Sequence, residues 1–184
     1  MLKFRVPPLV LRQSYAVCRE TNFGKRGFDD GTEEQQLHGV IAQNCMALAF
    51  GFPFVTKSDT WDGGFDFRIG EEKIDIKNVT RHVDALPNYE ARVISDQLRY
   101  DVQIYLFTSY NVKANELTVC GWLPKDLFLR KARVYKRGDL VRRDDGSQFV
   151  CRLNSHQIYY HQLNRMASDL DQLREDIEIY SILG

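Results

Sequence analysis

One segment of the chain has the apolar spacing of an amphipathic helix. Within 33–50 the apolar residues recur at steps of three and four, as Leu37, Ile41, Cys45 and Leu48. This spacing places them on one face of an α-helix. Asp30 or Thr32 is a suitable N-cap residue, and Gly51 is typical of the position that follows a helix. The pattern therefore predicts a helix over 33–50.

The second clear pattern is alternation with a period of two. It runs through 65–69 and 72–77, which are separated by Gly70-Glu71, and it predicts a β-hairpin with a two-residue turn. Longer apolar runs predict strands over 101–109 and 116–123. The rest of the chain predicts, in order, a short β-type run within 1–20, a polar segment over 21–32, a loop and helix over 84–100, a short helix over 125–135, a hairpin over 139–153 that turns at Asp145-Gly146, and helical stretches within 156–183.

The order of these elements is helix, hairpin, helix, strand, strand. It predicts an α/β or α+β domain with a central mixed sheet flanked by helices. A chain of 184 residues suits one compact domain. We expect its core over about 33–123, followed by a basic C-terminal extension over about 124–184.

The register of the hairpin at 65–77 follows from parity. With a two-residue turn, the numbers of paired residues sum to 141. Phe67 then faces Ile74, and Phe65 faces Ile76. This face is uniformly apolar, so we expect it to pack on the core.

The other face of the hairpin is charged. In the same register Asp66 lies opposite Asp75, and Lys77 lies diagonally beside Asp66. Two carboxylates across a strand pair repel each other. A divalent cation between them would remove that repulsion, and carboxylate oxygens suit Mg²⁺. An alternative is a solvated face on which these charges pair with one another.

The string Asp66…Asp75-Ile76-Lys77, in a hairpin that follows an amphipathic helix, resembles the PD-(D/E)xK nuclease superfamily of restriction endonucleases, Holliday-junction resolvases and phage exonucleases. The resemblance covers about 33–109; Gly64-Phe65 stands before Asp66, where the family name has proline. It implies a restriction-endonuclease-like core and Mg²⁺-dependent hydrolysis of DNA, with Mn²⁺ able to substitute. It also implies metal ligation at Asp66, Asp75 and Ile76, and a catalytic Lys77 that positions and activates the attacking water.

The resemblance further implies a carboxylate from the first helix, at a spacing that falls here on Gln43. An amide can hold a metal-bound water or ligate weakly, so Gln43 joins the candidate catalytic set. Glu33 lies on roughly the same helical face and is an alternative, whereas Glu34 points away. Both glutamates also suit the N-terminus of a helix dipole. Gln97 and Tyr100 are spaced like the Gln…Tyr pairs of some superfamily exonucleases, and equally like an ordinary amphipathic helix.

A local excess of basic residues marks 125–143, where the acids are only Asp126 and Asp139. Such a segment can follow a phosphate backbone, and a solvated helix face is the alternative. With the two basic residues of the hairpin, the candidate DNA-contacting residues are Arg68, Lys73, Lys131, Arg133, Lys136 and Arg137.

Composition sets limits on these expectations. Lys+Arg and Asp+Glu are 25 each, which excludes a polybasic mode of action for the whole chain. The sequence has no apolar run long enough for a transmembrane helix and no signal-peptide core. The four cysteines form no CxxC pair, and the histidines lack zinc-site spacing. We expect core thiols, no membrane partner and a cytoplasmic location, in the host cell if the source is a phage.

The expected function is therefore a Mg²⁺-dependent DNA nuclease, acting as an endonuclease or an exonuclease. The resemblance implies that its products carry 5′-phosphate and 3′-hydroxyl ends. Two alternatives stay open: a DNA-binding or assembly module that keeps the fold without catalysis, which Gln43 favours, and a nuclease that acts on RNA. A homodimer is one option for the oligomeric state.

Overall fold

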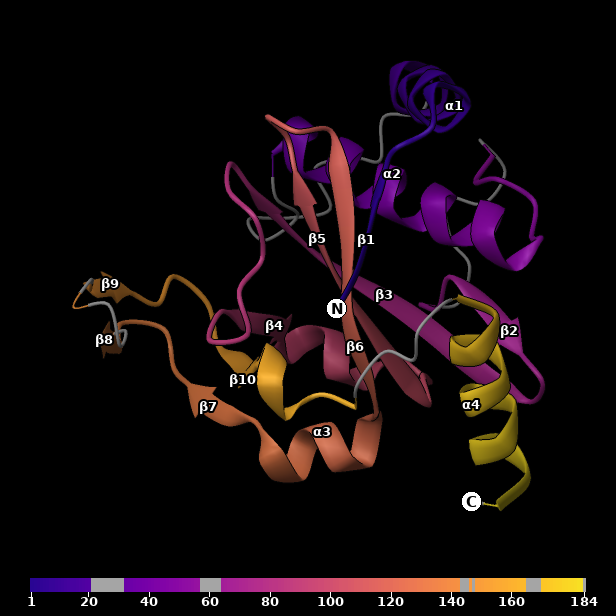
Figure 1. The fold of residues 1–184 in the computed structure, drawn as a ribbon. Coiled ribbons are helices and arrows are strands. Elements are labelled where there is room, and N and C mark those ends of the chain that lie inside the picture. Colours follow the sequence, from indigo (N-terminus) through magenta and orange to yellow (C-terminus); the bar gives the residue numbers. More distant parts are fainter. Residues whose placement is uncertain (21–31, 57–63, 143–145, 147, 165–169, 184) are drawn as a thin grey trace.

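The structure, a computed structural model, describes residues 1–20, 32–56, 64–142, 146, 148–164 and 170–183. Its centre is a mixed sheet in the order β1-β6-β5-β3-β2 (Figure 1). Strands β3 and β5 are parallel, and the other neighbours are antiparallel. The predicted α+β class is thus confirmed. The strands are β1 (Leu2–Arg5), β2 (Phe67–Ile69), β3 (Glu72–Arg81), β5 (Ile104–Asn111) and β6 (Glu116–Pro124).

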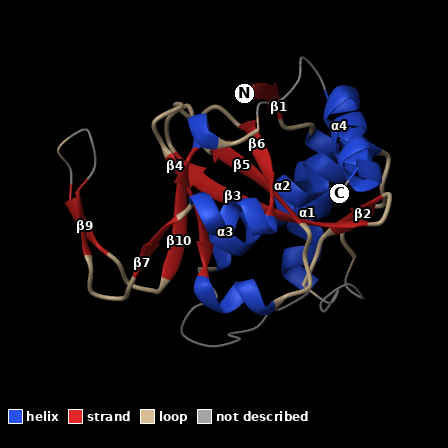
Figure 2. Ribbon diagram, turned by 90° about the horizontal axis from the view of Figure 1, so that it is seen from below, coloured by secondary structure: helices blue, strands red, loops and turns tan. Residues whose placement is uncertain are grey.

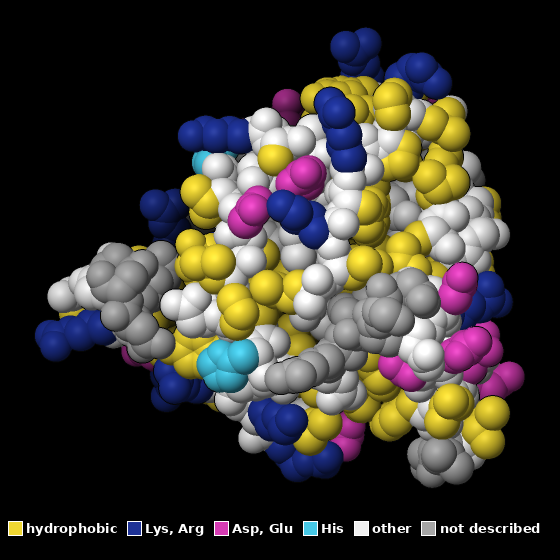
Figure 3. Space-filling model, viewed as in Figure 1, with side chains coloured by type: hydrophobic (Ala, Val, Ile, Leu, Met, Phe, Trp, Pro, Cys, Tyr) yellow, Lys and Arg dark blue, Asp and Glu magenta, His cyan; other side chains and the backbone are white. Residues whose placement is uncertain are grey.

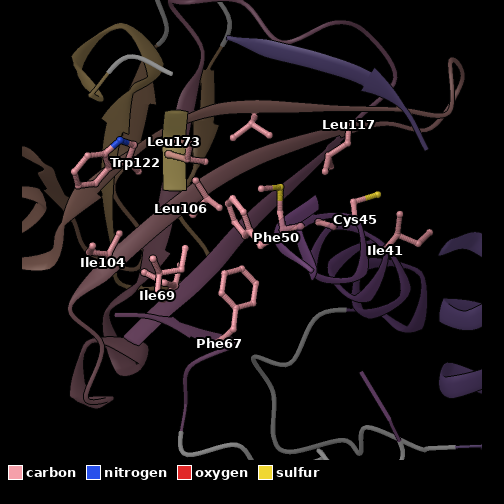
Figure 4. Packing of buried hydrophobic residues seen from close by; sticks show 14 of the residues in the cluster. Ile41, Cys45, Phe50, Phe67, Ile69, Ile104, Leu106, Leu117, Trp122 and Leu173 are labelled. Carbon is pink, nitrogen blue, oxygen red and sulfur yellow. The ribbon is translucent and has the colours of Figure 1, made fainter. Parts of the chain in front are cut away.

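One face of this sheet is covered by three helices. They are α1 (Pro8–Glu20), α2 (Glu33–Phe50) and α4 (Leu170–Leu183). Figure 4 shows Phe50 of α2 close to Leu106 and Phe67 of the sheet, and the rings of Phe50 and Phe67 lie 5.6 Å apart, edge to face. Leu173 of α4 is also fully buried in this cluster, so the core draws on residues beyond 33–123.

The opposite face is covered by a second, smaller sheet, by α3 (Lys125–Lys131), and by two 3₁₀ helices, η2 (Ser95–Arg99) and η3 (Tyr160–Gln162) (Figure 2). Phe128 of α3 is fully buried in the second apolar cluster together with Tyr105 and Phe107 of β5. The strands of the small sheet, in spatial order, are β4 (Glu90–Ile94), β10 (Ser155–Tyr159) and β7 (Arg133–Tyr135).

A two-stranded ribbon extends away from the body. It consists of β8 (Leu140–Arg142) and β9 (Gln148–Val150), which pair with each other in a sheet of their own. Figures 1 and 2 both show it projecting beyond β7 and β10. The hairpin expected over 139–153 is confirmed, while Asp145 of its predicted turn lies outside the described residues.

Helix α2 begins and ends as its sequence predicts. The hydroxyl of Thr32 accepts a hydrogen bond from the backbone N–H of Gln35, and the Gln35 side chain accepts one from the N–H of Thr32. This reciprocal capping box satisfies donors that the first helical turn leaves open. Gly51 ends the helix in the left-handed conformation, with φ 74°. The other candidate cap, Asp30, lies outside the described residues.

The helix expected within 84–100 is wrong. The chain there forms β4 followed by a short 3₁₀ helix, because β4 pairs with β10, with Val93 facing His156. In β4, Ala91 and Val93 are buried and Arg92 is exposed, which is the period of a strand. Long-range pairing therefore decides the conformation of this segment over its local helix propensity.

Three smaller differences separate expectation from structure. The 1–20 segment contains α1 as well as the expected β-type run, α3 stops at Lys131, and the 156–183 segment begins within a strand before α4. The strands expected over 101–109 and 116–123 are confirmed as β5 and β6. In the parts of the chain that the structure describes, no helix is both long enough and apolar enough to cross a membrane.

The four cysteines are free thiols. Cys45, Cys120 and Cys151 are buried, and Cys18 is half-buried. Burial raises the pKa of Cys45 and of Cys120 to about 12. These two thiols therefore stay protonated near neutral pH and act as small apolar side chains of the core.

Candidate functional site

The hairpin that carries the candidate site has the predicted register in its central part. Phe67 faces Ile74 and Arg68 faces Lys73. Phe67 and Ile74 are buried in the cluster beneath α2. The turn passes through Gly70, whose φ of 58° lies in the left-handed region that glycine adopts readily. The prediction that this face packs on the core is confirmed for these two residues.

The register changes at Asp66. Its backbone N–H donates to the carbonyl of Ile74 at 2.7 Å, although Ile74 already faces Phe67. Two residues of one strand thus oppose one of the other, as in a β-bulge. The expected ladder pair between Asp66 and Asp75 is therefore not formed. Instead Oδ2 of Asp66 accepts a hydrogen bond from the backbone N–H of Ile76 at 2.6 Å.

Phe65 also departs from the predicted pattern. It packs into the cluster on the opposite face of the sheet rather than against Ile76. The change begins at Gly64, whose φ is 90°. A Cβ at this position would come within 2.5 Å of the Tyr100 ring, so only glycine fits there. The close approach of Tyr100 therefore sets the path by which the chain enters β2.

Asp75 and Lys77 form an ion pair on one face of β3. Nζ of Lys77 lies 2.6 Å from Oδ2 of Asp75, and the two side chains are 15% and 9% exposed. Tyr105 lies beside them on β5, opposite Asp75 in the parallel ladder. Burial and the negative charge of Asp75 together raise the pKa of the Tyr105 phenol. The pair is thus held in a poorly solvated environment, where charges interact strongly.

The two aspartates converge on the same stretch of β3. The nitrogen of Ile76 is bonded directly to the carbonyl carbon of Asp75. The Asp66 oxygen that accepts from this nitrogen therefore lies within about 5 Å of the Asp75 Cα. Asp66 thus reaches the main chain of β3 between Asp75 and Lys77, through a side-chain hydrogen bond rather than through strand pairing.

Asp66 and Asp75 are the side chains there that could hold a hard divalent cation. Two carboxylates supply oxygen ligands, and Ile76 can add a main-chain oxygen. The hydroxyl of Tyr105 is buried and has no hydrogen-bond partner among the described residues, so a bound water could satisfy it. Within the described ranges no group of three or more His, Cys, Asp or Glu side chains could hold a metal. Mg²⁺ is commonly held by one or two carboxylates together with water and substrate phosphates.

Beside this stretch of β3 lies a cleft of about 1430 Å³. Pairing of β3 with β2 ends at Ile74, and the cleft begins at Ile76 and Lys77, along an edge of β3 that pairs there with no other described strand. Its other walls are the first turn of α2, the segment from β4 to η2, and the base of the β8–β9 ribbon. The described lining residues are Gln35, Gln36, residues 76–80, Arg92, Ile94, Asp96, Gln97, Arg137, Gly138 and residues 149–154.

The charged residues of this lining are mostly basic. Lys77, Arg92, Arg137 and Arg152 contribute positive charge, against Asp96 among the described residues. A cleft with low-dielectric walls and one sign of charge attracts ligands of the opposite sign. The lining therefore suits a polyanion such as a nucleic-acid backbone.

The candidate residues of α2 lie at different places relative to the cleft. Gln43 is half-buried and is not among the described residues that line it, whereas Gln35 and Gln36 are. Glu33 and Glu34 are exposed in the first turn. The part of α2 that reaches the cleft is thus its N-terminal turn.

The weaker candidate pair, Gln97 and Tyr100, is separated by the structure. Gln97 lines the cleft from η2. Tyr100 packs instead into the apolar cluster, against Gly64. Because this segment is not an α-helix, the helical spacing on which the pair was chosen does not apply to it.

The basic candidates of the hairpin are engaged with neighbours. Lys73 forms an ion pair with Asp101, and its ammonium lies 5.6 Å from the centre of the Phe65 ring. The Arg68 guanidinium lies 5.4 Å from the same ring. This face of the hairpin therefore carries two positively charged side chains close to the Phe65 ring.

The basic candidates of the C-terminal segment are exposed. Arg133 donates to the hydroxyl of Tyr159 and lies 4.9 Å from its ring centre. Lys131 and Lys136 project from the surface, and Arg137 lines the cleft. Of these residues, Arg137 lies on the cleft that also contains Lys77.

Arg92 and Arg152 are cleft residues that the sequence analysis did not select. Arg92 belongs to the segment expected to be a helix, and its exposure between two buried positions of β4 follows only once the strand is known. Arg152 lies nine residues beyond the basic segment at 125–143. The sequence indication for Arg152 was its place in a predicted hairpin whose other strand contains basic residues.

Comparison of the chain with protein-family models, with curated proteins and with solved structures gives no significant match.

Proposed function

We propose that the chain is a metal-dependent nuclease that hydrolyses DNA, with a restriction-endonuclease-like core and with Asp66, Asp75 and Lys77 at its active site. The proposal rests chiefly on one observation: Asp66 accepts from the Ile76 N–H between the ion-paired Asp75 and Lys77, and a large, mainly basic cleft begins at Ile76 and Lys77. The sequence alone gave only the spacing of Asp66, Asp75 and Lys77.

The order of elements around the site supports the same proposal. Helix α2 precedes the β2–β3 hairpin, and after a crossover β5 lies parallel to β3. The resemblance implies a helix, a three-stranded meander, a helix and a strand. The structure has α2, β2, β3, β4, a 3₁₀ helix and β5 in that order, but β4 pairs with β10 in the second sheet instead of completing a meander with β3. The volume of the cleft also exceeds that of a typical small-molecule pocket, which suits a polymeric substrate.

The residues divide the chemistry among them. Asp66 and Asp75 would hold Mg²⁺, with a main-chain oxygen of Ile76 as a further donor. The ion, when bound, polarises the phosphate and lowers the pKa of water. Lys77 orients the water that attacks phosphorus and stabilises the negative charge that develops on the phosphate oxygens. The P–O3′ bond breaks, which leaves a 5′-phosphate and a 3′-hydroxyl end.

The basic lining supplies the rest of the site. Arg92, Arg137 and Arg152 contact neighbouring phosphates and hold the nucleic-acid strand along this edge of β3. Gln36, at the start of α2, is better placed than Gln43 to contact the strand, because it lines the cleft. In this arrangement Gln43 supports the packing of α2.

A cleavage assay tests the proposal. The purified chain is incubated with linear, nicked and branched DNA and with RNA, in Mg²⁺, in Mn²⁺ and in EDTA. We expect DNA cleavage that requires the metal and that falls by roughly 10²- to 10⁴-fold in Lys77→Met. Lys3→Met is the matched control, because Lys3 is an ion-paired lysine of the same sheet at its far edge.

Three results would contradict the proposal. DNA binding without cleavage at any metal concentration would identify a binding module. Cleavage of RNA alone would identify a ribonuclease. Cleavage at an unchanged rate in Lys77→Met would place the active site elsewhere.

A further inference from the structure

The β8–β9 ribbon has two different faces. Val141 and Phe149 face each other across the strands on one face; Val141 is 4% exposed, and Phe149 is half-buried and lines the cleft. The other face carries two cross-strand pairs, Leu140 with Val150 and Arg142 with Gln148. All four of these residues are exposed, and Leu140 and Val150 are 55% and 57% exposed. This second face is therefore accessible to a partner.

The base of the ribbon is tied firmly to the body. Gly138 and Cys151 each donate a backbone hydrogen bond across the base, to Cys151 and Asp139. The Asn154 side chain accepts from the N–H of Arg137, and its carbonyl accepts from Ser95 of η2. The base of the ribbon is thus hydrogen-bonded to η2 through the Asn154 carbonyl.

The sequence over 136–154 carries five basic and three acidic residues, of which Arg143, Asp144 and Asp145 lie outside the described residues. The described residues at 136–142 and 148–154 include Lys136, Arg137, Arg142 and Arg152, against Asp139. The carboxylate of Asp139 accepts from the backbone N–H of Lys136, which occupies it within the base. In Figure 3, dark blue Lys and Arg side chains lie around the projecting end of the molecule, and acidic side chains gather at the other end, over α4. The ribbon therefore complements a polyanion.

The shape and residue types of this face indicate which class of polyanion is the partner. The major groove of B-DNA admits a two-stranded β-ribbon. Arginine makes bidentate hydrogen bonds to guanine there, glutamine makes them to adenine, and apolar side chains contact the thymine methyl group. The exposed face offers each of these: Arg142 beside Gln148, and Leu140 beside Val150.

We propose that the exposed face of the β8–β9 ribbon enters the major groove of duplex DNA and reads base sequence through Arg142 and Gln148, beside the cleft that contains Lys77. The cleavage of the bound DNA rests on the proposed function, whereas recognition of its sequence by the ribbon does not. Strand β9 borders the cleft, so a duplex held in the cleft meets the ribbon. Binding, and with it cleavage, then depends on sequence.

A binding selection tests this without any need for cleavage. The full chain, in EDTA, is offered a library of duplexes with a randomised centre, and the bound fraction is sequenced. We expect a short motif to be enriched. In Arg142→Lys combined with Gln148→Ala, enrichment falls by roughly 10- to 100-fold, because lysine keeps the charge and loses the bidentate pairing.

Controls separate reading from folding and from simple attraction. Arg174→Lys, on α4, keeps the wild-type motif. The melting temperature of the ribbon variant stays near that of the wild type, since both side chains are exposed. Total affinity for mixed-sequence DNA changes little in Arg142→Lys, because phosphate contacts depend on charge.

The outcomes are distinct from those of the cleavage assay. Binding of the library with no motif enriched overturns the proposal, as does a motif that survives in the ribbon variant. Failure to bind duplex, together with self-association that is lost in Leu140→Ser/Val150→Ser, overturns it in favour of a protein interface. An enriched motif without metal-dependent cleavage supports the reading and contradicts the proposed nuclease.

Discussion

The two faces of strand β3 carry different kinds of side chain. Toward α2, Ile74 is fully buried, and the polar residues beyond it are neutral: His38 is hydrogen-bonded to Thr80 at 3.1 Å, and Asn78 donates to the carbonyl of His38. On the opposite face the corresponding positions carry the charges of Asp75 and Lys77.

This difference indicates what each face is for. Neutral, hydrogen-bonded groups packed against a helix add stability at little electrostatic cost. A poorly solvated ion pair is a weak source of stability, since replacing it with apolar groups is often neutral or stabilising. Stability therefore accounts for the face toward α2, whereas the charged face calls for a functional explanation, which the proposed metal-dependent phosphate chemistry would supply.

The largest expected change in stability comes from the apolar face. Ile74→Ala removes a fully buried side chain from the cluster beneath α2. We expect the free energy of unfolding to fall by about 2–5 kcal/mol, measured by urea denaturation. Ile182→Ala is the control, because Ile182 is 81% exposed, and its effect should stay within about 0.5 kcal/mol. Equal effects of the two changes would show that Ile74 does not belong to the core.

Removing one charge of the Asp75–Lys77 ion pair should have the next largest effect on the free energy of unfolding. Asp75→Asn leaves the ammonium of Lys77 in a poorly solvated place without its partner. We expect a loss of up to about 3 kcal/mol in the free energy of unfolding. Thr80→Val, which removes a neutral hydrogen bond on the other face, should lose only about 1 kcal/mol. If Thr80→Val were the more damaging change, the contrast between the faces would be wrong.

Asp66 allows its structural role to be separated from its charge. Asp66→Ala removes the acceptor for the Ile76 N–H and should lower the free energy of unfolding by about 1–2 kcal/mol. Asp66→Asn keeps an acceptor oxygen, so we expect near wild-type stability. Both variants should lose cleavage, because both lose the carboxylate. Full activity in Asp66→Asn would remove Asp66 from the proposed metal site.

The smallest expected effect is a pH dependence on the α2 side. Burial lowers the pKa of His38 below its ordinary value of 6.5. Between the lowered pKa and 6.5, the unfolded chain binds more protons at this residue than the folded protein does. The contribution of His38 to stability is therefore complete above pH 6.5 and is lost as the pH falls through this window.

Thermal unfolding of the wild type and of His38→Gln between pH 7.5 and pH 5 measures this contribution. We expect the wild type to lose more stability on acidification than the variant does. Parallel curves for the two proteins would show that His38 is not buried in its neutral form.

Much of the fold could be predicted from local pattern. The apolar spacing of 33–50, with Thr32 and Gly51 at its ends, gave α2 correctly, and the apolar runs gave β5 and β6. The central register of the β2–β3 hairpin followed from parity alone. These elements carry their signal within a short stretch of chain.

The wrong predictions concern segments whose conformation depends on residues far away in the sequence. Strand β4 forms because it pairs with β10, more than sixty residues later, at Val93 and His156. Close to the bulge at Asp66, the chain passes against the ring of Tyr100 at Gly64. Neither contact could be seen from local spacing.

The site was predicted in the same uneven way. Asp66, Asp75 and Lys77 were chosen from spacing. The structure adds an ion pair between Asp75 and Lys77 and a hydrogen bond from the Ile76 N–H to Asp66, neither of which spacing predicted. The cleft residues Arg92 and Arg152 come from segments whose positions depend on the second sheet. Their selection required the tertiary structure.

The double variant Asp75→Asn/Lys77→Met tests the central claim most directly, with unfolding free energy and Mg²⁺-dependent DNA cleavage measured on the same preparation. It removes both charges and leaves side chains of similar size. We predict an unfolding free energy within about 1 kcal/mol of the wild type and a loss of cleavage of at least roughly 100-fold. A protein that cleaves DNA at the wild-type rate with both charges removed would contradict the account.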